Sequence, residues 1–352
     1  LFFENTKEKK IARIKNQECD FFIDDLEKVL SDKKFPNDTE GLFFNEKRNK
    51  NFKNFSNWNE LIIFFKKKLA EKNNFNGKNN ECFTIKNKSI FVKKFNNNFK
   101  KELKFHKFLS KNNIKNIAQI VSTSNKRKLI KYKFYKNLKK KVITKKIILN
   151  VFKFIKNINK LNYSKEKFKY AKDYSRNITD YKKELKERIF FKKKSLEYKK
   201  NSKFRKLINK IEINFINLEK NNYFKNKYLF KNNQIILSPC DFHFENIIFC
   251  KKVIFIDFEY SGLDDPAKLF SVFFLQPNHL IKKKLFLTCI DKILFFKKNN
   301  LIKKRILFLM PIIYLRWALI LLNNFSTKQL NKSIQYLHQR KEYYNLYKNY
   351  LS

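Results

Sequence analysis

Three polar residues between positions 241 and 257 have the types and the spacing that phosphoryl transfer requires. Asp241 is followed five residues later by Asn246, on a loop that leads into the apolar run 247–249. A second apolar run, 253–256, ends directly before Asp257. One carboxylate can accept the proton of an attacking hydroxyl, while an amide oxygen and a second carboxylate can hold Mg2+ against nucleotide phosphates. The segment therefore predicts a loop and hairpin built for phosphoryl transfer.

The chain continues from this segment into the motif GLDDP at 262–266. Together, the loop, the hairpin and this motif resemble the aminoglycoside phosphotransferase and choline kinase family, which has the fold of protein kinases. By this resemblance, Asp241 is the catalytic base, and Asn246 and Asp257 are ligands of Mg2+. Asp265 is expected to cap the helix that follows it, because Asp is favoured at the N-cap and Pro at the first helical position.

Two places in this region depart from the family pattern. Pro239 and Cys240 stand where the family usually has His and Gly, and Leu269 stands where it has a later Asp. Neither change touches proton transfer or metal binding, so both weaken the placement in a subfamily more than they weaken the expected activity. We interpret His243 as a residue that packs the loop, with contact to substrate as the alternative. Because the family's His and Gly are missing here and the expected nucleotide-covering turn has a single Gly, a non-catalytic nucleotide-binding scaffold stays open as an alternative function.

The residues upstream of the loop predict a small β-rich lobe. The segment 75–80 is rich in residues that tolerate positive φ, and it predicts a turn. The alternating run 82–85 and the run 90–95 predict a strand pair, and 129–132 predicts the last strand of the lobe. A helix is expected over 99–109.

By the resemblance, this small lobe binds ATP. Gly77 and Asn79 belong to the turn that covers the nucleotide. Lys93 is the strand lysine that meets the α- and β-phosphates, and Glu102 on the next helix is its ion-pair partner. Lys94 is the alternative lysine, but Lys93 fits better because it stands two residues before an aromatic side chain. The alternative for Glu102 is a solvent-facing helix charge.

The C-terminal half of the chain is mainly helical in period, interrupted by the hairpin. The fold class expected is α+β, a protein-kinase-like two-lobe fold with a small β-rich N-lobe and a large helical C-lobe carrying the catalytic hairpin, preceded by a short N-terminal α/β fragment. The helices expected in the C-lobe are 147–162, 180–199, 204–219, 282–298 and 302–324. The boundaries expected are 1–48 for the fragment, 49–72 for a connector with an apolar helix at 58–70, 73–136 for the N-lobe and 137–352 for the C-lobe.

Residues 1–48 predict a helix, one short strand and a further helix. Asp24 and Asp25 follow the strand 20–23, where open α/β folds often bind Mg2+. The pattern FFIDDLEKVL resembles the last acidic motif of haloacid-dehalogenase-type phosphatases, with a helix N-cap as the alternative role for the acids. That family's nucleophilic Asp has no counterpart here. We therefore expect no phosphatase activity from the fragment, and loose packing or mobility, because a lone strand is not stable.

The chain is strongly basic, with 81 Lys and Arg against 31 Asp and Glu and a net charge of +50. The lysines are spread along the whole chain together with Asn, Phe and Ile, while there are only three Gly and one Met. A bias towards A/T-rich codons accounts for all of these residues, whereas a phosphate-binding surface accounts only for Lys. A basic nucleic-acid-binding protein is thus an alternative favoured by charge alone, and no specific nucleic-acid partner is expected.

The five cysteines show neither a disulfide framework nor a zinc-site spacing, which favours reduced thiols and a cytoplasmic location. The longest apolar stretch, 306–322, contains a Pro and a central Arg, so a buried helix is a better interpretation than a membrane span. The sequence begins at Leu1 without a Met, and we expect that an upstream portion precedes it.

These observations predict a phosphotransferase that uses ATP and Mg2+ and acts on a hydroxyl or amine of a small molecule. After Pro266 the only acidic residues are Asp291 and Glu342. A polycationic acceptor usually needs several acids around it, so a neutral or anionic, sugar-type acceptor is favoured over an aminoglycoside. The pattern does not name the acceptor or the oligomeric state.

Overall fold

The structure of the chain is a computed structural model. It describes residues 4–37, 39–47, 49–70, 73–75, 80–85, 89–138, 143–175, 177–225, 235–292 and 299–346. These residues form two compact units, the first built from 1–99 and 118–135 and the second from 100–117 and 136–352.

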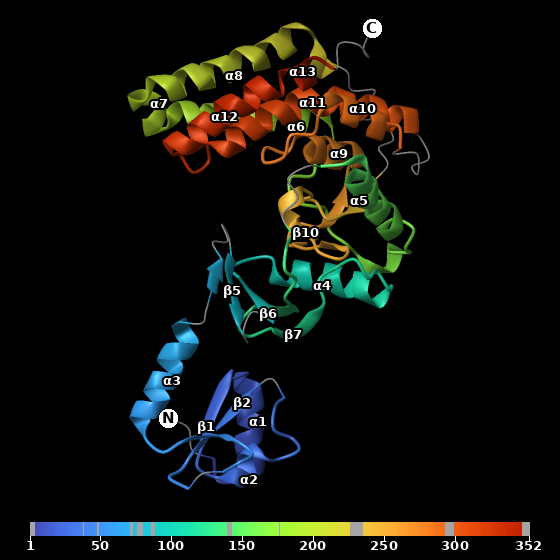
Figure 1. The fold of residues 1–352 in the computed structure, drawn as a ribbon. Helices are drawn as coiled ribbons and strands as arrows, with labels where there is room; N and C mark the ends of the chain where they lie inside the picture. Colours follow the sequence, from blue (N-terminus) through green and yellow to red (C-terminus); the bar gives the residue numbers. More distant parts are fainter. Residues whose placement is uncertain are drawn as a thin grey trace. The chain divides into compact units, whose positions relative to one another are not determined.

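The first unit contains a five-stranded antiparallel sheet with the strand order β4-β5-β6-β8-β7 (Figure 1). The strands are β4 (Asn73–Phe75), β5 (Asn80–Ile85), β6 (Ile90–Phe95), β7 (Ile120–Ser124) and β8 (Leu129–Lys133). The predicted strand pair is confirmed as β5 and β6, and the predicted last strand as β8. Since β6 is the middle strand, Lys93 lies at the centre of the sheet, between Cys82 and Ile130 as cross-strand partners.

The N-terminal residues of the first unit form a second, parallel sheet with the order β1-β2-β3. Its elements are α1 (Lys7–Gln17), β1 (Phe21–Asp24), α2 (Glu27–Leu30), β2 (Glu40–Phe44), β3 (Lys53–Phe55) and α3 (Trp58–Ala70). The prediction of a lone strand is therefore wrong: β2 pairs with β1 on one side and with β3 on the other, which gives the three strands that a stable sheet needs. A cluster around Leu42, Phe55 and Phe64 buries one side of this sheet against α3.

Helix α3 begins where the sequence provides a capping box. The side chain of Asn57 accepts a hydrogen bond from the backbone of Glu60 at 3.0 Å, and the Glu60 carboxylate accepts one from the backbone of Ser56 at 2.9 Å. Glu60 thus bonds back to the residue before the N-cap, which is a variant of the capping box. The helix predicted at 58–70 is confirmed.

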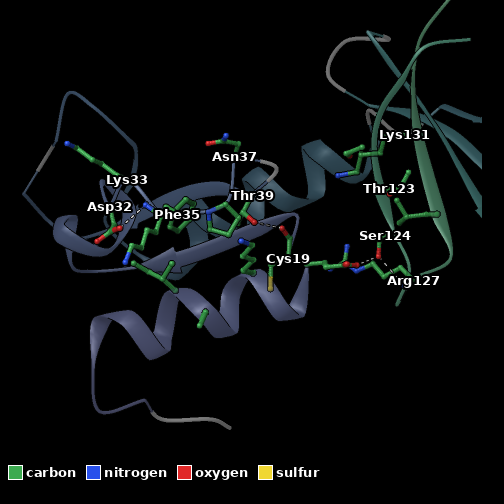
Figure 2. A pocket seen from close by; sticks show the side chains of 18 of the residues that line it. Cys19, Asp32, Lys33, Phe35, Asn37, Thr39, Thr123, Ser124, Arg127 and Lys131 are labelled. Atoms are coloured by element: carbon green, nitrogen blue, oxygen red, sulfur yellow. Dashed lines mark hydrogen bonds between the residues drawn. The ribbon is translucent and has the colours of Figure 1, made fainter. Parts of the chain in front are cut away.

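Polar contacts link the N-terminal sheet to the β7–β8 hairpin within the first unit. The carboxylate of Glu18 accepts the hydroxyl of Ser124, and Asp20 pairs with Arg127 at 3.0 Å and with Lys131 at 3.2 Å. A cavity of about 880 Å3 lies beside these contacts, as Figure 2 shows. We expected residues 1–48 to be loosely packed or mobile and did not predict these contacts.

The second unit is mainly helical, with α6, α8, α11 and α12 packed together (Figure 1). Its helices are α4 (Phe99–Lys111), α5 (Lys145–Ile158), α6 (Ile178–Lys194), α7 (Leu196–Lys200), α8 (Ser202–Lys220), α9 (Pro266–Leu275), α10 (Lys283–Ile290), α11 (Asn299–Leu321), α12 (Thr327–Gln339) and α13 (Lys341–Asn345). The single helix predicted over 180–199 is wrong, because Ser195 adopts an extended backbone there and caps α7 by accepting from Tyr198 at 3.3 Å.

Helix α11 contains the apolar stretch considered as a membrane span. No helix in the described part of the chain is both long and apolar enough to cross a bilayer. Arg305 and Arg316 of this helix are buried, and each makes an ion pair with a carboxylate inside the second unit. The interpretation of this stretch as a buried helix is confirmed.

Two short strand pairs complete the second unit. The hairpin is formed by β10 (Ile247–Phe249) and β11 (Val253–Phe255), and β9 (Ile236–Ser238) pairs antiparallel with β12 (Gly262–Asp264). The segment 239–246 connects β9 to β10, and Asp257 lies between β11 and β12. The buried helix α9 follows β12.

Candidate active site

The loop that carries Asp241 is a tight turn fixed by its own backbone. The Asp241 N–H donates to the carbonyl of Pro239 at 3.0 Å, and the Phe242 N–H donates to the carbonyl of Cys240 at 2.8 Å. Cys240 has a φ of 67°, which is left-handed and uncommon for a residue with a side chain. Phe242 and Phe244 are buried on either side of His243 and anchor the loop. The Asp241 side chain is 36% exposed, so it is open to a ligand.

The three residues predicted from the sequence lie on connected backbone. The side-chain amide of Asn246 donates to the carbonyl of Asp241 at 2.7 Å, and the Ile256 N–H donates to the carbonyl of Asn246 at 3.1 Å. Asp257 follows directly, with a left-handed φ of 67°. The loop and the end of the hairpin are thus tied together, and the fold brings Asp241, Asn246 and Asp257 into one region.

His243 contacts the carboxylate of Asp241. Its Nε2 lies 3.2 Å from Oδ1 of Asp241, and its Nδ1 lies 3.9 Å from Oε2 of Glu245. Burial disfavours the charged imidazole, but the hydrogen bond and charge of Asp241 outweigh it and raise the pKa of His243. Burial likewise raises the pKa of Asp241, yet His243 and the charges of Lys172 and Arg316 lower it below its usual range. The carboxylate is therefore ionised at neutral pH and able to accept a proton.

Asn246 and Asp257 have the donor atoms that Mg2+ prefers. Because the amide group of Asn246 donates to Asp241, its oxygen is oriented away from that bond. The described residues contain no cluster of three or more His, Cys, Asp or Glu side chains able to hold a metal. Mg2+ usually binds one or two protein oxygens together with substrate phosphates rather than a complete protein cage. An amide and a carboxylate oxygen fit that kind of site.

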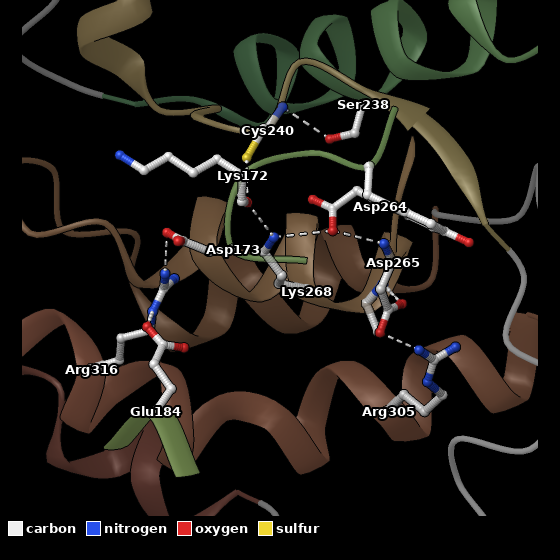
Figure 3. A network of polar contacts seen from close by, with 12 residues as sticks. Lys172, Asp173, Glu184, Ser238, Cys240, Asp264, Asp265, Lys268, Arg305 and Arg316 are labelled. Atoms are coloured by element: carbon white, nitrogen blue, oxygen red, sulfur yellow. Dashed lines mark hydrogen bonds and ion pairs between the residues drawn. The ribbon is translucent and has the colours of Figure 1, made fainter. Parts of the chain in front are cut away.

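A network of polar contacts joins the loop that carries Asp241 to α9, as Figure 3 shows. Lys268 on α9 pairs with Asp264 at 3.0 Å and also donates to the carbonyl of Lys172 at 3.3 Å. The thiol of Cys240 donates to the same carbonyl at 3.2 Å. Burial raises the pKa of this thiol to about 12, so it stays protonated and able to donate. The network joins α9, the catalytic loop and the segment around residue 172.

Three further ion pairs, made by two arginines of α11, flank this network. Asp265 caps α9, accepting from the Ala267 N–H at 2.8 Å, and its other oxygen pairs with Arg305 of α11. The predicted cap is confirmed. Arg316 of α11 pairs with Asp173 at 2.7 Å and with Glu184 of α6 at 2.8 Å. These contacts fix the end of α9 and the segment 172–173 against the helical core.

The residues predicted to bind ATP are described only in part. Lys93 is 6% exposed and Glu102 is 1% exposed. They belong to different units, so their ion pair stays a prediction. Lys94 is exposed and pairs with Glu81 at 3.1 Å, which leaves Lys93 as the better candidate. Gly77 and Asn79 lie outside the described residues.

The sequence interpretation did not identify several residues of this region. Lys268 and Asp264 are four residues apart at the start of a helix, a spacing that could have identified the pair. Asp173 and Arg316 are separated by 143 residues, and no local pattern connects them. Lys172 is one of very many lysines, so its sequence position carries no signal.

Asp24, the buried acid of the predicted pair in the N-terminal sheet, makes local contacts. Asp24 is 5% exposed. One oxygen of its carboxylate accepts from the Leu26 N–H at 3.0 Å, and the other pairs with Lys10 at 2.8 Å. The bond to Leu26 is the local contact that a turn-forming Asp makes. The predicted N-cap is wrong in detail, because Leu26 holds that position and α2 has no side-chain cap.

The fold is similar to those of solved phosphotransferases and a small-molecule kinase. An AMP-bound spectinomycin phosphotransferase matches with a TM-score of 0.55 and 14% identity, covering 78% of this chain and 90% of that chain. The gentamicin complex of APH(2″)-IIa matches with a TM-score of 0.52 and 16% identity, covering 81% and 97%. An ethanolamine kinase of Plasmodium vivax matches with a TM-score of 0.50 and 18% identity, covering 96% and 95%. No protein-family model and no curated protein matches the chain.

These likenesses define the class of fold. The chain has a small lobe built on a β-sheet and a large helical lobe, as the kinase-like structures do, and the predicted fold class is confirmed. The haloacid-dehalogenase resemblance of the first 48 residues has no support among them.

Proposed function

We propose that the protein is a phosphotransferase that uses ATP and Mg2+ and transfers the γ-phosphoryl group to a small molecule. The observation that carries this proposal is the linked arrangement of Asp241, Asn246 and Asp257 on one loop and hairpin. The kinase-like fold supports the proposal. The three residues lie in the segment that resembles the aminoglycoside phosphotransferase and choline kinase family in sequence. Phosphoryl transfer asks a protein mainly for positioning and charge stabilisation, and this arrangement can supply both.

Asp241 is the proposed catalytic base. Its carboxylate accepts the proton of the acceptor hydroxyl or amine as the new bond to the γ-phosphorus forms. The bond between the γ-phosphorus and the bridging oxygen breaks, and ADP leaves with that electron pair. His243 holds the carboxylate in place by its hydrogen bond at 3.2 Å.

Asn246 and Asp257 are the proposed protein ligands of Mg2+. Lys93 is proposed to hold the phosphates, with Glu102 as its ion-pair partner. Bound Mg2+ neutralises phosphate charge and fixes the phosphate oxygens. Asp257→Ala should therefore abolish Mg2+-dependent binding of ATP, while the matched exposed variant Asp291→Ala leaves it unchanged. Titration calorimetry with and without Mg2+ measures both. Equal Mg2+-dependent affinity in the two variants would overturn the metal assignment.

The acceptor is best sought with purified protein, ATP, Mg2+ and a panel of sugars, amines and amino-alcohols, with ADP formation as the readout. We expect at least one member to be phosphorylated at a rate well above the hydrolysis of ATP by water. Tight binding of Mg2+ and ATP without turnover on any member would instead favour the nucleotide-binding scaffold. That alternative draws on Pro239 and Cys240 in place of the family's His and Gly.

A further inference from the structure

The segment before α6 is fixed against the catalytic region by backbone hydrogen bonds. Tyr170 and Leu263 form an isolated parallel bridge. The Leu263 N–H donates to the carbonyl of Lys169 at 3.0 Å, and the Ala171 N–H donates to the carbonyl of Leu263 at 2.9 Å. The Lys172 N–H donates to the carbonyl of Tyr260 at 3.1 Å. A surface loop with this many main-chain anchors holds its side chains at defined positions.

Lys172 is anchored from its other side as well. Its carbonyl accepts from the Cys240 thiol at 3.2 Å and from the Lys268 ammonium at 3.3 Å. Cys240 directly precedes Asp241 in the chain, so the backbone of Lys172 is joined to the loop that carries the proposed base. Figure 3 shows Lys172 next to Cys240 and Asp173.

The side chain of Lys172, unlike its backbone, is exposed. Its ammonium lies 4.1 Å from the centroid of the Tyr260 ring, which restricts the side chain without neutralising it. The charge of Lys172 acts on Asp241 and contributes to the lowered pKa of that carboxylate. Within the described ranges, no carboxylate lies at ion-pair distance from this ammonium.

In the described part of the chain, three other cations of this region are paired with carboxylates. Arg316 is held between Asp173 and Glu184. His243 is held between Asp241 and Glu245. Lys268 is buried and paired with Asp264.

Lys172 is therefore an exposed cation on a backbone that is bonded to the residue before the proposed base, and no carboxylate of the described chain pairs with it. A negatively charged substrate group would supply that partner at low cost, since an exposed ammonium that is already restricted loses little freedom on binding. A positively charged acceptor would instead meet a like charge next to Asp241.

We propose that Lys172 binds an anionic group of the acceptor, a carboxylate or a phosphate, and positions its hydroxyl at Asp241. The inference rests on the proposed function and narrows the acceptor class to hydroxy acids and phosphorylated alcohols or sugars. The γ-phosphate of ATP is the other anion that could bind this cation. If Lys172 binds the acceptor, its loss raises the KM of the acceptor; if it binds the γ-phosphate, its loss raises the KM of ATP.

The kinetic test compares acceptors of matched size and different charge: glycerol, glycerate, glycerol 3-phosphate and choline. With the unmodified chain, we expect kcat/KM to be at least tenfold higher for one of the anions than for glycerol or choline. Lys172→Gln should raise the KM of that anion at least tenfold and leave the KM of ATP within twofold. Lys172→Arg should restore most of the loss, and Lys165→Gln, an exposed lysine seven residues upstream, should change neither constant.

Two kinetic results would overturn the proposal. A preference for glycerol or choline that Lys172→Gln does not alter would show that no anion is recognised there. A Lys172→Gln variant that weakens ATP and affects all acceptors equally would assign the lysine to the γ-phosphate.

A second measurement needs no turnover. Acetic anhydride labels exposed lysines, and mass spectrometry of the full chain reads the rate at each one. Glycerol 3-phosphate at millimolar concentration should slow the acetylation of Lys172 at least threefold and leave Lys165 unchanged, whereas glycerol should protect neither. Protection of Lys172 without phosphorylation of any acceptor would support the anion site and contradict the phosphotransferase proposal. Equal labelling rates with and without glycerol 3-phosphate would overturn the anion site.

Discussion

Nε2 of His243 lies 3.2 Å from Oδ1 of Asp241, so the residue two positions after the proposed base holds its carboxylate. His243 also faces Glu245 and feels the charge of Asp257, and these carboxylates add to the rise in its pKa. Our sequence interpretation treated His243 as a packing residue. The contact makes it a positioning residue for Asp241.

The pH dependence of turnover should report this contact. The pKa of His243 is raised. The charged pair of His243 and Asp241 is therefore complete at a pH below the ordinary imidazole pKa, and it is lost as the pH rises through the raised pKa of His243. The pKa of Asp241 is lowered, so the pair is lost on the acid side only below the ordinary carboxyl value. We expect kcat to fall about threefold to tenfold across the alkaline transition. His243→Gln should remove that transition and move the acid limb to higher pH, and superimposable kcat profiles would contradict the positioning role.

Lys268 and Asp264 form a buried ion pair in which each charge neutralises the other, so removing one partner should lower the free energy of unfolding. Both side chains are almost completely buried, at 4% and 0% exposure. Lys268→Met leaves Asp264 as an uncompensated buried charge and should lower the free energy of unfolding by about 3–5 kcal/mol. The double variant with Asp264→Asn should recover much of this loss. Urea denaturation measures each change.

Lys94→Met is the matched control for that experiment. Its pair with Glu81 is exposed on both sides, and removing it should cost about 0–1 kcal/mol. If Lys268→Met were as mild as Lys94→Met, the pair would not be buried in solution as described.

Gly262 allows the segment 169–171 to approach β12. An added Cβ would overlap the carbonyl oxygen of Lys169 and adjacent backbone, which cannot yield as a flexible side chain can. Gly262→Ala should therefore destabilise the fold by about 1–3 kcal/mol and displace the anchored Lys172. Gly41→Ala is the control, because the atoms nearest to a Cβ there belong to the flexible side chain of Leu30. Equal unfolding midpoints for the two variants would contradict the close approach.

The candidate site could be predicted because its chemistry lies in one short segment. Asp241, Asn246 and Asp257 fall within seventeen residues, a span in which spacing alone restricts geometry. The β5–β6 pair and the cap at Asp265 are local as well. Residues that meet through tertiary packing left no such pattern, as the pair of Asp173 and Arg316 shows.

The errors in the predicted fold have physical causes too. Parallel pairing of β1 with β2 joins residues about twenty positions apart, and short strands of this kind are hidden in a chain rich in Phe and Lys everywhere. The break at Ser195 was missed because the helical period continues across it, whereas the serine's hydroxyl favours a new cap.

The central claim is that Asp241 acts on the acceptor and not on the nucleotide. The most direct test measures turnover and ATP affinity of Asp241→Asn, once an acceptor is identified. The amide has nearly the shape of the carboxylate but cannot accept the proton, so kcat should fall by at least about 100-fold. The dissociation constant of the Mg2+ and ATP complex should stay within about threefold of the original. Near-normal phosphorylation of the acceptor by Asp241→Asn would contradict the account.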